Sequence, residues 1–404
     1  MTRMSASVAE LPVVSGTRRL LAVQGPLQFV AGYTALGWLA ADTGADDQLV
    51  LLMYDFLMSP AIEPEFARVI EQLAAVRPWT RIVFIDSARM NGIMGGKYSG
   101  AVAALHAVLG SADFDEIYLA RDFCGHGSPL IGNAYPAAKK IAYGDSLGLV
   151  GDRADFADFD ASRPIRSVLS ACKRAARRFL LGGPSRYHFD AAVLSLPLDL
   201  SRGELDAIAL IVPPKQHVQR SIRAVAEPLV GLREYSRELL DFAGASSAHL
   251  LLLSNLSGSG LMSAENEIAL YVHIVTTNTG RGDTVFLKVH PRSSREVIDA
   301  VVARLSGAVR IKVIDDPGLA RLPVELWSDL LDACSVIAVF STAALNIKYV
   351  YDKDVALPLS DELVERYIFP HKIEYIKTAN RMIEESIAAL SNWDCRSVLW
   401  KKYP

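Results

Sequence analysis

The segment Lys288-Val289-His290-Pro291-Arg292 carries the side chains in this sequence that are best suited to binding a phosphate. It ends the apolar run 284–289, which has the length and composition of a buried strand, and Pro291 cannot continue a strand ladder. A helical pattern begins at Ser294. Cationic side chains and an imidazole beside the free amides of a helix start favour a phosphate site. A surface histidine in an ordinary strand-end turn is the alternative.

Two other polar groups follow apolar runs in the same half of the chain. Ser341-Thr342 comes directly after the run 336–340, at the start of a helical pattern. Hydroxyls there either cap the helix or, with its amides, bind an anion. A loop at 254–260 follows the run 249–253 and has neither a GxGxxG nor a P-loop pattern. Its polar residues and glycines permit close approach of a ligand, and the candidates are Asn255, Ser257, Gly258, Ser259 and Gly260.

In the first half, Gly144-Asp145-Ser146 places a carboxylate between small residues after a short apolar run. Such a carboxylate is able to act as a general base on a hydroxyl, and an ordinary turn aspartate is the alternative. His126 follows another apolar run and is a second candidate on this side. Asp315-Asp316-Pro317 does not have the spacing of a metal-binding DxD motif, so we predict a turn there and no metal site.

The elements that must position these residues alternate between strand-length apolar runs and helical patterns, which predicts parallel βαβ units. In the first half the predicted strands are 20–23, 49–53, 82–85, 117–120, 191–196 and 207–212, with helices at 27–40, 64–75 and 98–109. In the second half the predicted strands are 249–253, 284–289, 309–314 and 336–340, with helices at 264–275, 294–305, 324–331, 343–351 and 373–390.

Two such series predict an α/β protein of two Rossmann-like domains that face a central cleft. We place the first domain at residues 1–245, the second at 246–372, and a C-terminal helical segment at 373–404 that packs back on the first domain. In open α/β sheets ligands bind beyond the carboxyl ends of the strands, where the candidate residues lie.

Composition excludes several functional classes. The 404 residues carry a formal net charge of -3, which argues against a general nucleic-acid-binding protein. The four cysteines are isolated, which favours a reducing cytoplasm over a disulfide framework. The apolar stretch 20–41 is interrupted by polar residues and glycines, so we expect no transmembrane helix there. Peripheral contact with the inner face of a membrane stays open, as does the oligomeric state.

Together these residues resemble the bacterial sialyltransferases and polysialyltransferases of the two-Rossmann (GT-B) type. That family carries an acidic motif in the first domain, and then a His-Pro motif and a Ser-Ser or Ser-Thr pair in the second. The counterparts here are Gly144-Asp145-Ser146, His290-Pro291 and Ser341-Thr342, in the same order. The turn Gln24–Gln28 and the segment Leu322-Pro323-Val324-Glu325 are also similar to family segments. The acidic motif departs from the family pattern of two acids and a glycine.

The resemblance implies an inverting, metal-independent and cofactor-free transfer of a sialic-acid-like nonulosonic acid from a CMP donor to a glycan or glycolipid hydroxyl. Asp145 would be the base, and His290 would assist the departing phosphate, which Ser341 and Thr342 hold. Glu325 would bind the ribose and the 255–260 loop the donor, with Lys288, Pro291 and Arg292 beside the phosphate. Gln28 and His126 would line the acceptor side.

Two alternatives remain. One is a transferase that uses another donor, such as CMP-Kdo or a CDP-polyol, because teichoic-acid-type polymerases share the His-Pro and Ser-Ser/Thr features. The other is a catalytically silent protein of the same fold that binds a nucleotide or a glycan, which the altered acidic motif keeps open.

Overall fold

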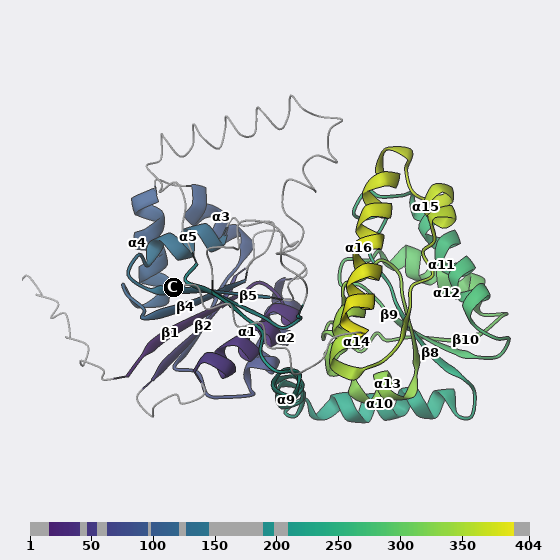
Figure 1. The fold of residues 1–404 in the computed structure, drawn as a ribbon, viewed down its shortest axis with the longest axis horizontal. Helices are drawn as coiled ribbons and strands as arrows, with labels where there is room; N and C mark the ends of the chain where they lie inside the picture. The colour runs from purple at the N-terminus through teal and green to yellow at the C-terminus, as the bar shows by residue number, and fades with distance from the viewer. Residues whose placement is uncertain are drawn as a thin grey trace, which may run out of the picture.

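The computed structural model describes residues 16–40, 47–54, 63–95, 98–120, 127–144, 189–197 and 209–391. Two α/β domains lie side by side and are joined along one edge by two helices (Figure 1). Each is built on a sheet in which every recorded strand pair is parallel. This confirms the predicted α/β class and the arrangement of two Rossmann-like domains.

The first domain holds a seven-stranded sheet in the order β3-β2-β1-β4-β5-β6-β7. Its central strands are apolar on both faces because helices cover both sides of a parallel sheet. The strands are β1 (Arg18–Val23), β2 (Gln48–Tyr54), β3 (Arg81–Ile85), β4 (Glu116–Ala120), β5 (Lys139–Gly144), β6 (Ala191–Leu194) and β7 (Ala209–Ile211). The helices are α1 (Pro26–Leu39), α2 (Glu63–Ala74), α3 (Ser87–Gly95), α4 (Tyr98–Leu109) and α5 (Gly127–Ala134).

The second domain holds a five-stranded sheet in the order β10-β9-β8-β11-β12. The strands are β8 (Ala248–Leu252), β9 (Thr284–Lys288), β10 (Arg310–Val313), β11 (Ser335–Ala338) and β12 (Val355–Ala356). The helices are α11 (Ala264–Asn278), α12 (Arg295–Leu305), α13 (Ser328–Ala333), α14 (Ala343–Tyr351), α15 (Asp361–Tyr367) and α16 (Ile373–Ser391), with short turns η3 (Val324–Leu326) and η4 (Pro370–Lys372).

The helix α9 (Lys215–Ala226) connects the two domains (Figure 1). On one side His217 Nε2 lies 3.0 Å from the carbonyl oxygen of Thr34 in α1. On the other side Gln219 Nε2 donates to the carbonyl oxygen of Val350 in α14 at 2.7 Å. The next helix, α10 (Val230–Ala243), packs on α13. The chain therefore crosses between the domains at α9, ahead of the predicted boundary at 246.

Two further expectations differ from the structure. The predicted helix 324–331 is divided at Trp327, whose φ of -91° and ψ of 51° interrupt the helical path between η3 and α13. The main contacts of α16 are with α14, α15 and η4 of the second domain, not with the first domain. Its apolar face, which includes Ile376 and Ile383, is buried there, and Asn380 donates to the carbonyl oxygen of Leu359 at 3.0 Å. Residues 392–404 lie outside the described part of the chain.

Candidate functional site

Three strands of the second domain end side by side and bring the predicted residues together. The register pairs Leu252 of β8 with Lys288 of β9 on one side and with Ala338 of β11 on the other. His290 and Phe340 each lie two residues past these positions, at the same level of the sheet. Two strand spacings are about 10 Å, a separation at which side chains from the two strand ends are able to contact one phosphate between them. The β8/β11 boundary is also where the strand order reverses, the usual ligand position in such sheets.

His290 is half-buried at the end of β9, and its protonation state is set by a local contact. Its Nδ1 accepts a hydrogen bond from the backbone N–H of Arg292 at 3.1 Å. Burial, together with the positive charges of Arg292 and Lys288, lowers the pKa of His290 below its ordinary value. The imidazole is therefore neutral near pH 7 and carries its proton on Nε2, so it is available as a hydrogen-bond donor.

Lys288 is 8% exposed, although a donor to a ligand was expected to face the cleft. Its ammonium group donates to the carbonyl oxygen of Ala320 and lies 6.0 Å from the ring centre of Trp327. Burial is the main cause that lowers its pKa to about 8, while the carboxylate of Glu325 opposes the shift. Lys288 therefore lies beneath the strand ends as a buried charge of low proton affinity.

Glu325 is also inside the domain, with 2% of its surface exposed. One carboxylate oxygen accepts a hydrogen bond from Asn346 Nδ2 at 2.7 Å, and its backbone carbonyl accepts one from Tyr351. In this position the carboxylate is a counter-charge for Lys288. Its predicted contact with a ribose stays a prediction.

The start of α14 is open to an anion. Thr342 is the N-cap residue, yet its side chain makes no capping hydrogen bond, so the capping interpretation does not hold for Thr342. Phe340 has a φ of 52°, an uncommon left-handed conformation for a bulky residue. Ser254 Oγ donates to the carbonyl oxygens of Val339 and Phe340 at 2.7 and 3.0 Å, which fixes this turn against the end of β8. Ser341 and Thr342 are thereby held at the strand ends.

The loop after β8 has a defined shape that the sequence pattern did not reveal. Glu267, which is 2% exposed, accepts from the backbone N–H groups of Leu256 and Ser257 at 3.1 and 2.9 Å and from the Ser257 hydroxyl. Gly260 has a φ of 70°, and a side chain at Gly258 would collide with Asn255. The loop is thus held from below by Glu267, and its residues 258–260 are exposed.

The opposite wall belongs to the first domain and is only partly described. Gln28 Oε1 accepts from the backbone N–H of Gln24 at 2.7 Å, so this side chain closes the β1–α1 turn. Asp145 follows Gly144, the last residue of β5, and His126 follows β4, but both lie outside the described residues.

One residue that the sequence did not single out crosses the gap between the domains. Arg321 Nη2 lies 2.6 Å from a carboxylate oxygen of Glu65 in α2, and Nη1 lies 3.4 Å from the carbonyl oxygen of Pro291. Arg321 belongs to the segment after β10, next to the Ala320 carbonyl that binds Lys288. A charge in a loop gives no sequence signal for such a contact.

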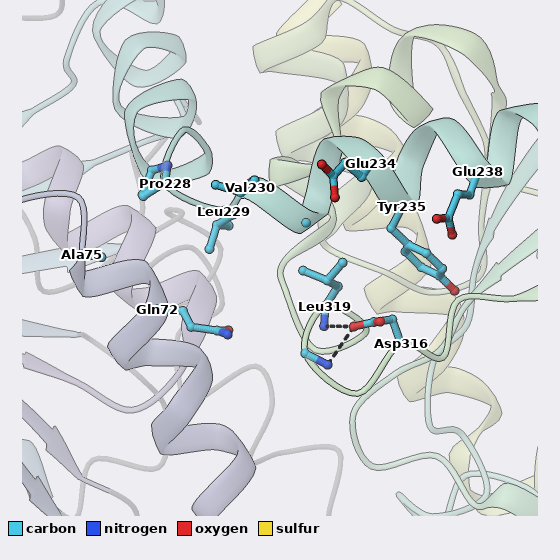
Figure 2. Close-up of a pocket in the computed structure, with 12 residues that line it drawn as sticks. Gln72, Ala75, Pro228, Leu229, Val230, Glu234, Tyr235, Glu238, Asp316 and Leu319 are labelled. Atoms are coloured by element: carbon cyan, nitrogen blue, oxygen red, sulfur yellow. Dashed lines mark hydrogen bonds between the residues drawn. The ribbon is translucent and has the colours of Figure 1, made fainter.

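A pocket of about 530 Å³ is lined in part by the 316–319 turn, which precedes Arg321 in the chain (Figure 2). Gln72 of α2 faces it from the first domain, Glu234 and Tyr235 of α10 from the second, and Leu319 from the 316–319 turn. Asp316 Oδ1 accepts from the backbone N–H groups of Gly318 and Leu319 at 2.8 and 3.0 Å, which confirms the predicted turn. Glu234, Glu238 and Asp316 give this pocket an acidic lining, whereas the strand ends carry cationic side chains.

Among the residues that the structure describes, no cluster of three or more His, Cys, Asp or Glu side chains is arranged to hold a metal ion. None of the helices in the described part of the chain has the length and apolar character needed to span a bilayer.

Comparison of folds finds only distant likeness. The chain is similar to MnaA of S. aureus in a structure with UDP, at 10% identity and a TM-score of 0.49, over 93% of this chain and 88% of that one. It is similar to the UDP-GlcNAc 2-epimerase of Neisseria meningitidis bound to UDP-GlcNAc, at 11% identity and a TM-score of 0.47, over 94% and 95%. It is also similar to CalG4, the calicheamicin glycosyltransferase, at 11% identity and a TM-score of 0.40, over 93% and 95%. At these values the likeness carries no argument about function.

Sequence comparison gives a more specific result. No curated protein matches the chain. Residues 217–359 match the family model of the alpha-2,8-polysialyltransferases, from α9 to just beyond β12. The matched segment contains His290-Pro291, Glu325 and Ser341-Thr342, which carry the second-domain part of the predicted resemblance, whereas Gly144-Asp145-Ser146 and the turn Gln24–Gln28 lie outside it. Over this segment the chain is similar to the alpha-2,8-polysialyltransferase family.

Proposed function

We propose that this chain transfers a sialic-acid-like nonulosonic acid from a CMP-activated donor to a glycan hydroxyl, with inversion and without a metal. The observation that carries the proposal is the state of His290. Because Nδ1 is occupied by the N–H of Arg292, the proton lies on Nε2. A neutral imidazole with this tautomer is able to donate to an oxygen of the departing CMP phosphate.

The departing phosphate gains negative charge as the glycosidic bond breaks, so donors aimed at it stabilise the transition state more than the ground state. In the proposed complex these donors are His290 Nε2, the hydroxyls of Ser341 and Thr342, and the first amides of α14. Negative charge on the phosphate also raises the proton affinity of His290. As this charge develops, the imidazole changes from a hydrogen-bond donor into a general acid.

On the acceptor side we propose Asp145 as the base that takes the proton from the acceptor hydroxyl, with Gln28 and His126 nearby. The 255–260 loop would contact the nucleotide, and Glu325 would approach the ribose only if its bond to Asn346 changes. We place this activity in the cytoplasm, with peripheral contact to the membrane where the acceptor is a glycolipid.

Thermal-shift measurements with CMP, CDP, UDP and GDP test the donor. A ligand that binds only the folded state at about 100 times its Kd stabilises it by about 2.7 kcal/mol. We expect CMP to raise the Tm most. A larger shift with UDP or GDP would contradict the proposal, and a larger shift with CDP would favour a CDP-polyol donor.

Two substitutions of one residue test the role of His290. In His290→Asn the amide oxygen replaces Nδ1 as acceptor for Arg292, but the donor at the Nε2 position is lost. In His290→Gln the amide nitrogen lies near the position of Nε2. We expect His290→Asn to lower transfer by about 100-fold or more, as for loss of one transition-state donor, and His290→Gln to retain more activity. An equal loss of transfer activity in both variants would show that His290 has a structural role only.

A further inference from the structure

The ion pair between Arg321 and Glu65 joins the ligand-facing edges of the two domains. Glu65 lies in the first turn of α2, which follows β2, and Arg321 lies between β10 and η3. The side chain of Arg321 is 22% exposed and that of Glu65 is 46% exposed, so water and ligands have access to the pair. α2 continues from there to Gln72, which lines the 530 Å³ pocket together with residues of α10 (Figure 2).

Arg321 is next to the phosphate-binding candidates of the second domain. Its Nη1 lies 3.4 Å from the carbonyl oxygen of Pro291, the residue after His290. Its positive charge contributes to the lowered pKa of Lys288, as expected for two cations at short range. With Lys288 and Arg292, it makes the end of β9 a position of concentrated positive charge.

The position of Arg321 differs from that of the other phosphate-binding candidates. His290, Ser341, Thr342 and the α14 amides lie at the strand ends of the second domain, whereas the Arg321 guanidinium reaches Glu65 of the first domain. If a nucleotide binds along the strand ends of the second domain, Arg321 is placed to meet a group of the donor that extends toward the first domain. The planar guanidinium fits a carboxylate well, and it already binds one in Glu65.

We infer that Arg321 binds the sugar carboxylate of the donor and that Glu65 competes with this carboxylate for the guanidinium. The inference rests on the proposed function, because a nonulosonic acid carries a carboxylate on its anomeric carbon whereas a common hexose or a polyol does not. Donor binding then exchanges one carboxylate for another on Arg321 and releases Glu65 on the acceptor side.

This exchange predicts opposite effects for the two partners of one ion pair. Arg321→Gln removes the binding group, so donor affinity falls. Glu65→Gln removes the competitor, so donor affinity rises. An ion pair that only holds the domains together predicts the same direction for both variants, since either substitution breaks it.

Isothermal titration with two probes, CMP and the slowly reacting fluorinated analogue of CMP-N-acetylneuraminic acid, distinguishes these cases. A hydrogen bond to a charged group corresponds to about a tenfold or greater change in affinity. We expect Arg321→Gln to weaken binding of the CMP-sugar analogue by about tenfold or more and binding of CMP by less than about threefold. Glu65→Gln should strengthen binding of the analogue and leave CMP binding unchanged.

The matched control is Arg304→Gln, which breaks the exposed Arg304–Glu265 pair within the second domain and should change neither affinity. Equal weakening of CMP and of the analogue by Arg321→Gln would show that Arg321 binds the phosphate and overturn the inference. Weakening of the analogue by both Arg321→Gln and Glu65→Gln would also overturn it. If the wild-type chain binds CMP and the analogue, the proposed donor class stands even when the variants overturn the inference. If it binds neither, both fail.

Discussion

Replacing Lys288 by methionine tests the most unusual feature of the site, a buried ammonium group. Methionine has a similar length and fills the space under the strand ends without a charge. The wild-type ammonium donates to the Ala320 carbonyl and lies against Trp327, and burial lowers its pKa from 10.5 to about 8. The side chain is 8% exposed, so screening by water is small.

The pKa values set the size of the effect. The difference between 10.5 and about 8 corresponds to about 3 kcal/mol by which the folded state disfavours the charged lysine. Below about pH 8 the lysine is protonated in both states and the full cost is present. Between about pH 8 and 10.5 only the unfolded chain keeps the proton, so the stability of the wild type rises relative to that of Lys288→Met.

Loss of the hydrogen bond to the Ala320 carbonyl costs the variant about 1 kcal/mol whether or not the lysine is charged, because a neutral amine still donates. The cation–π contact with Trp327 exists only while the lysine is charged, so the wild type also loses it as the pH rises. We therefore expect Lys288→Met to be about 2 kcal/mol more stable than the wild type at neutral pH and about 1 kcal/mol less stable above about pH 10.5. The change of sign is the decisive feature.

The assay is urea unfolding followed by circular dichroism at a series of pH values, with Lys312→Met as a control. Lys312 is exposed on β10, so its substitution should give a stability difference that does not vary with pH. Other titrating groups are shared by wild type and variant and cancel in the difference. A flat difference for Lys288→Met across this range would refute the assignment of a buried ammonium of lowered pKa.

Two further predictions concern the loop and the acceptor side. Glu267→Gln replaces one acceptor oxygen by an NH2 group that faces the N–H groups of the 255–260 loop. We therefore expect the free energy of unfolding to fall by about 1–3 kcal/mol and the affinity for CMP to weaken. The control Glu265→Gln, on the exposed face of α11, should change neither quantity by a comparable amount. Asp145→Asn should lower transfer from the CMP donor by about 100-fold or more with an unchanged Tm shift by CMP, and unchanged transfer would remove Asp145 from the base role.

The sequence predicted the sheets well because parallel strands buried on both faces give short, unmixed apolar runs. β1, β2, β4, β8 and β9 all lie within a residue or two of the predicted limits. It also placed His290 and Ser341 at strand ends, and the parallel register of β9, β8 and β11 puts these ends at the same edge of the sheet. Patterns of this kind are local, so a single sequence contains them.

Features that depend on distant partners were not predictable. The helices α9 and α10 have ordinary amphipathic patterns, and nothing local says that α9 packs on α1 and α14 at once. Lys288 was expected to face a ligand because a strand-end lysine usually remains solvated, but the Ala320 carbonyl and Trp327 provide a buried place for it. The partner of Arg321 belongs to the other domain.

The second domain carries the donor side of the proposed reaction through contacts of its own. The strand ends of β8, β9 and β11 position His290 and Ser341, and Glu267 fixes the shape of the loop. Lys288 is buried next to them, and the charge of Glu325 partly offsets its own. The matched segment 217–359 covers these elements and also α9, the helix that packs on both domains. Helix α9 packs on both domains, and the Arg321–Glu65 ion pair also joins them, near the carboxyl ends of the strands. In the proposed reaction, the donor carboxylate replaces Glu65 on Arg321, and the release of Glu65 couples donor binding to the acceptor side.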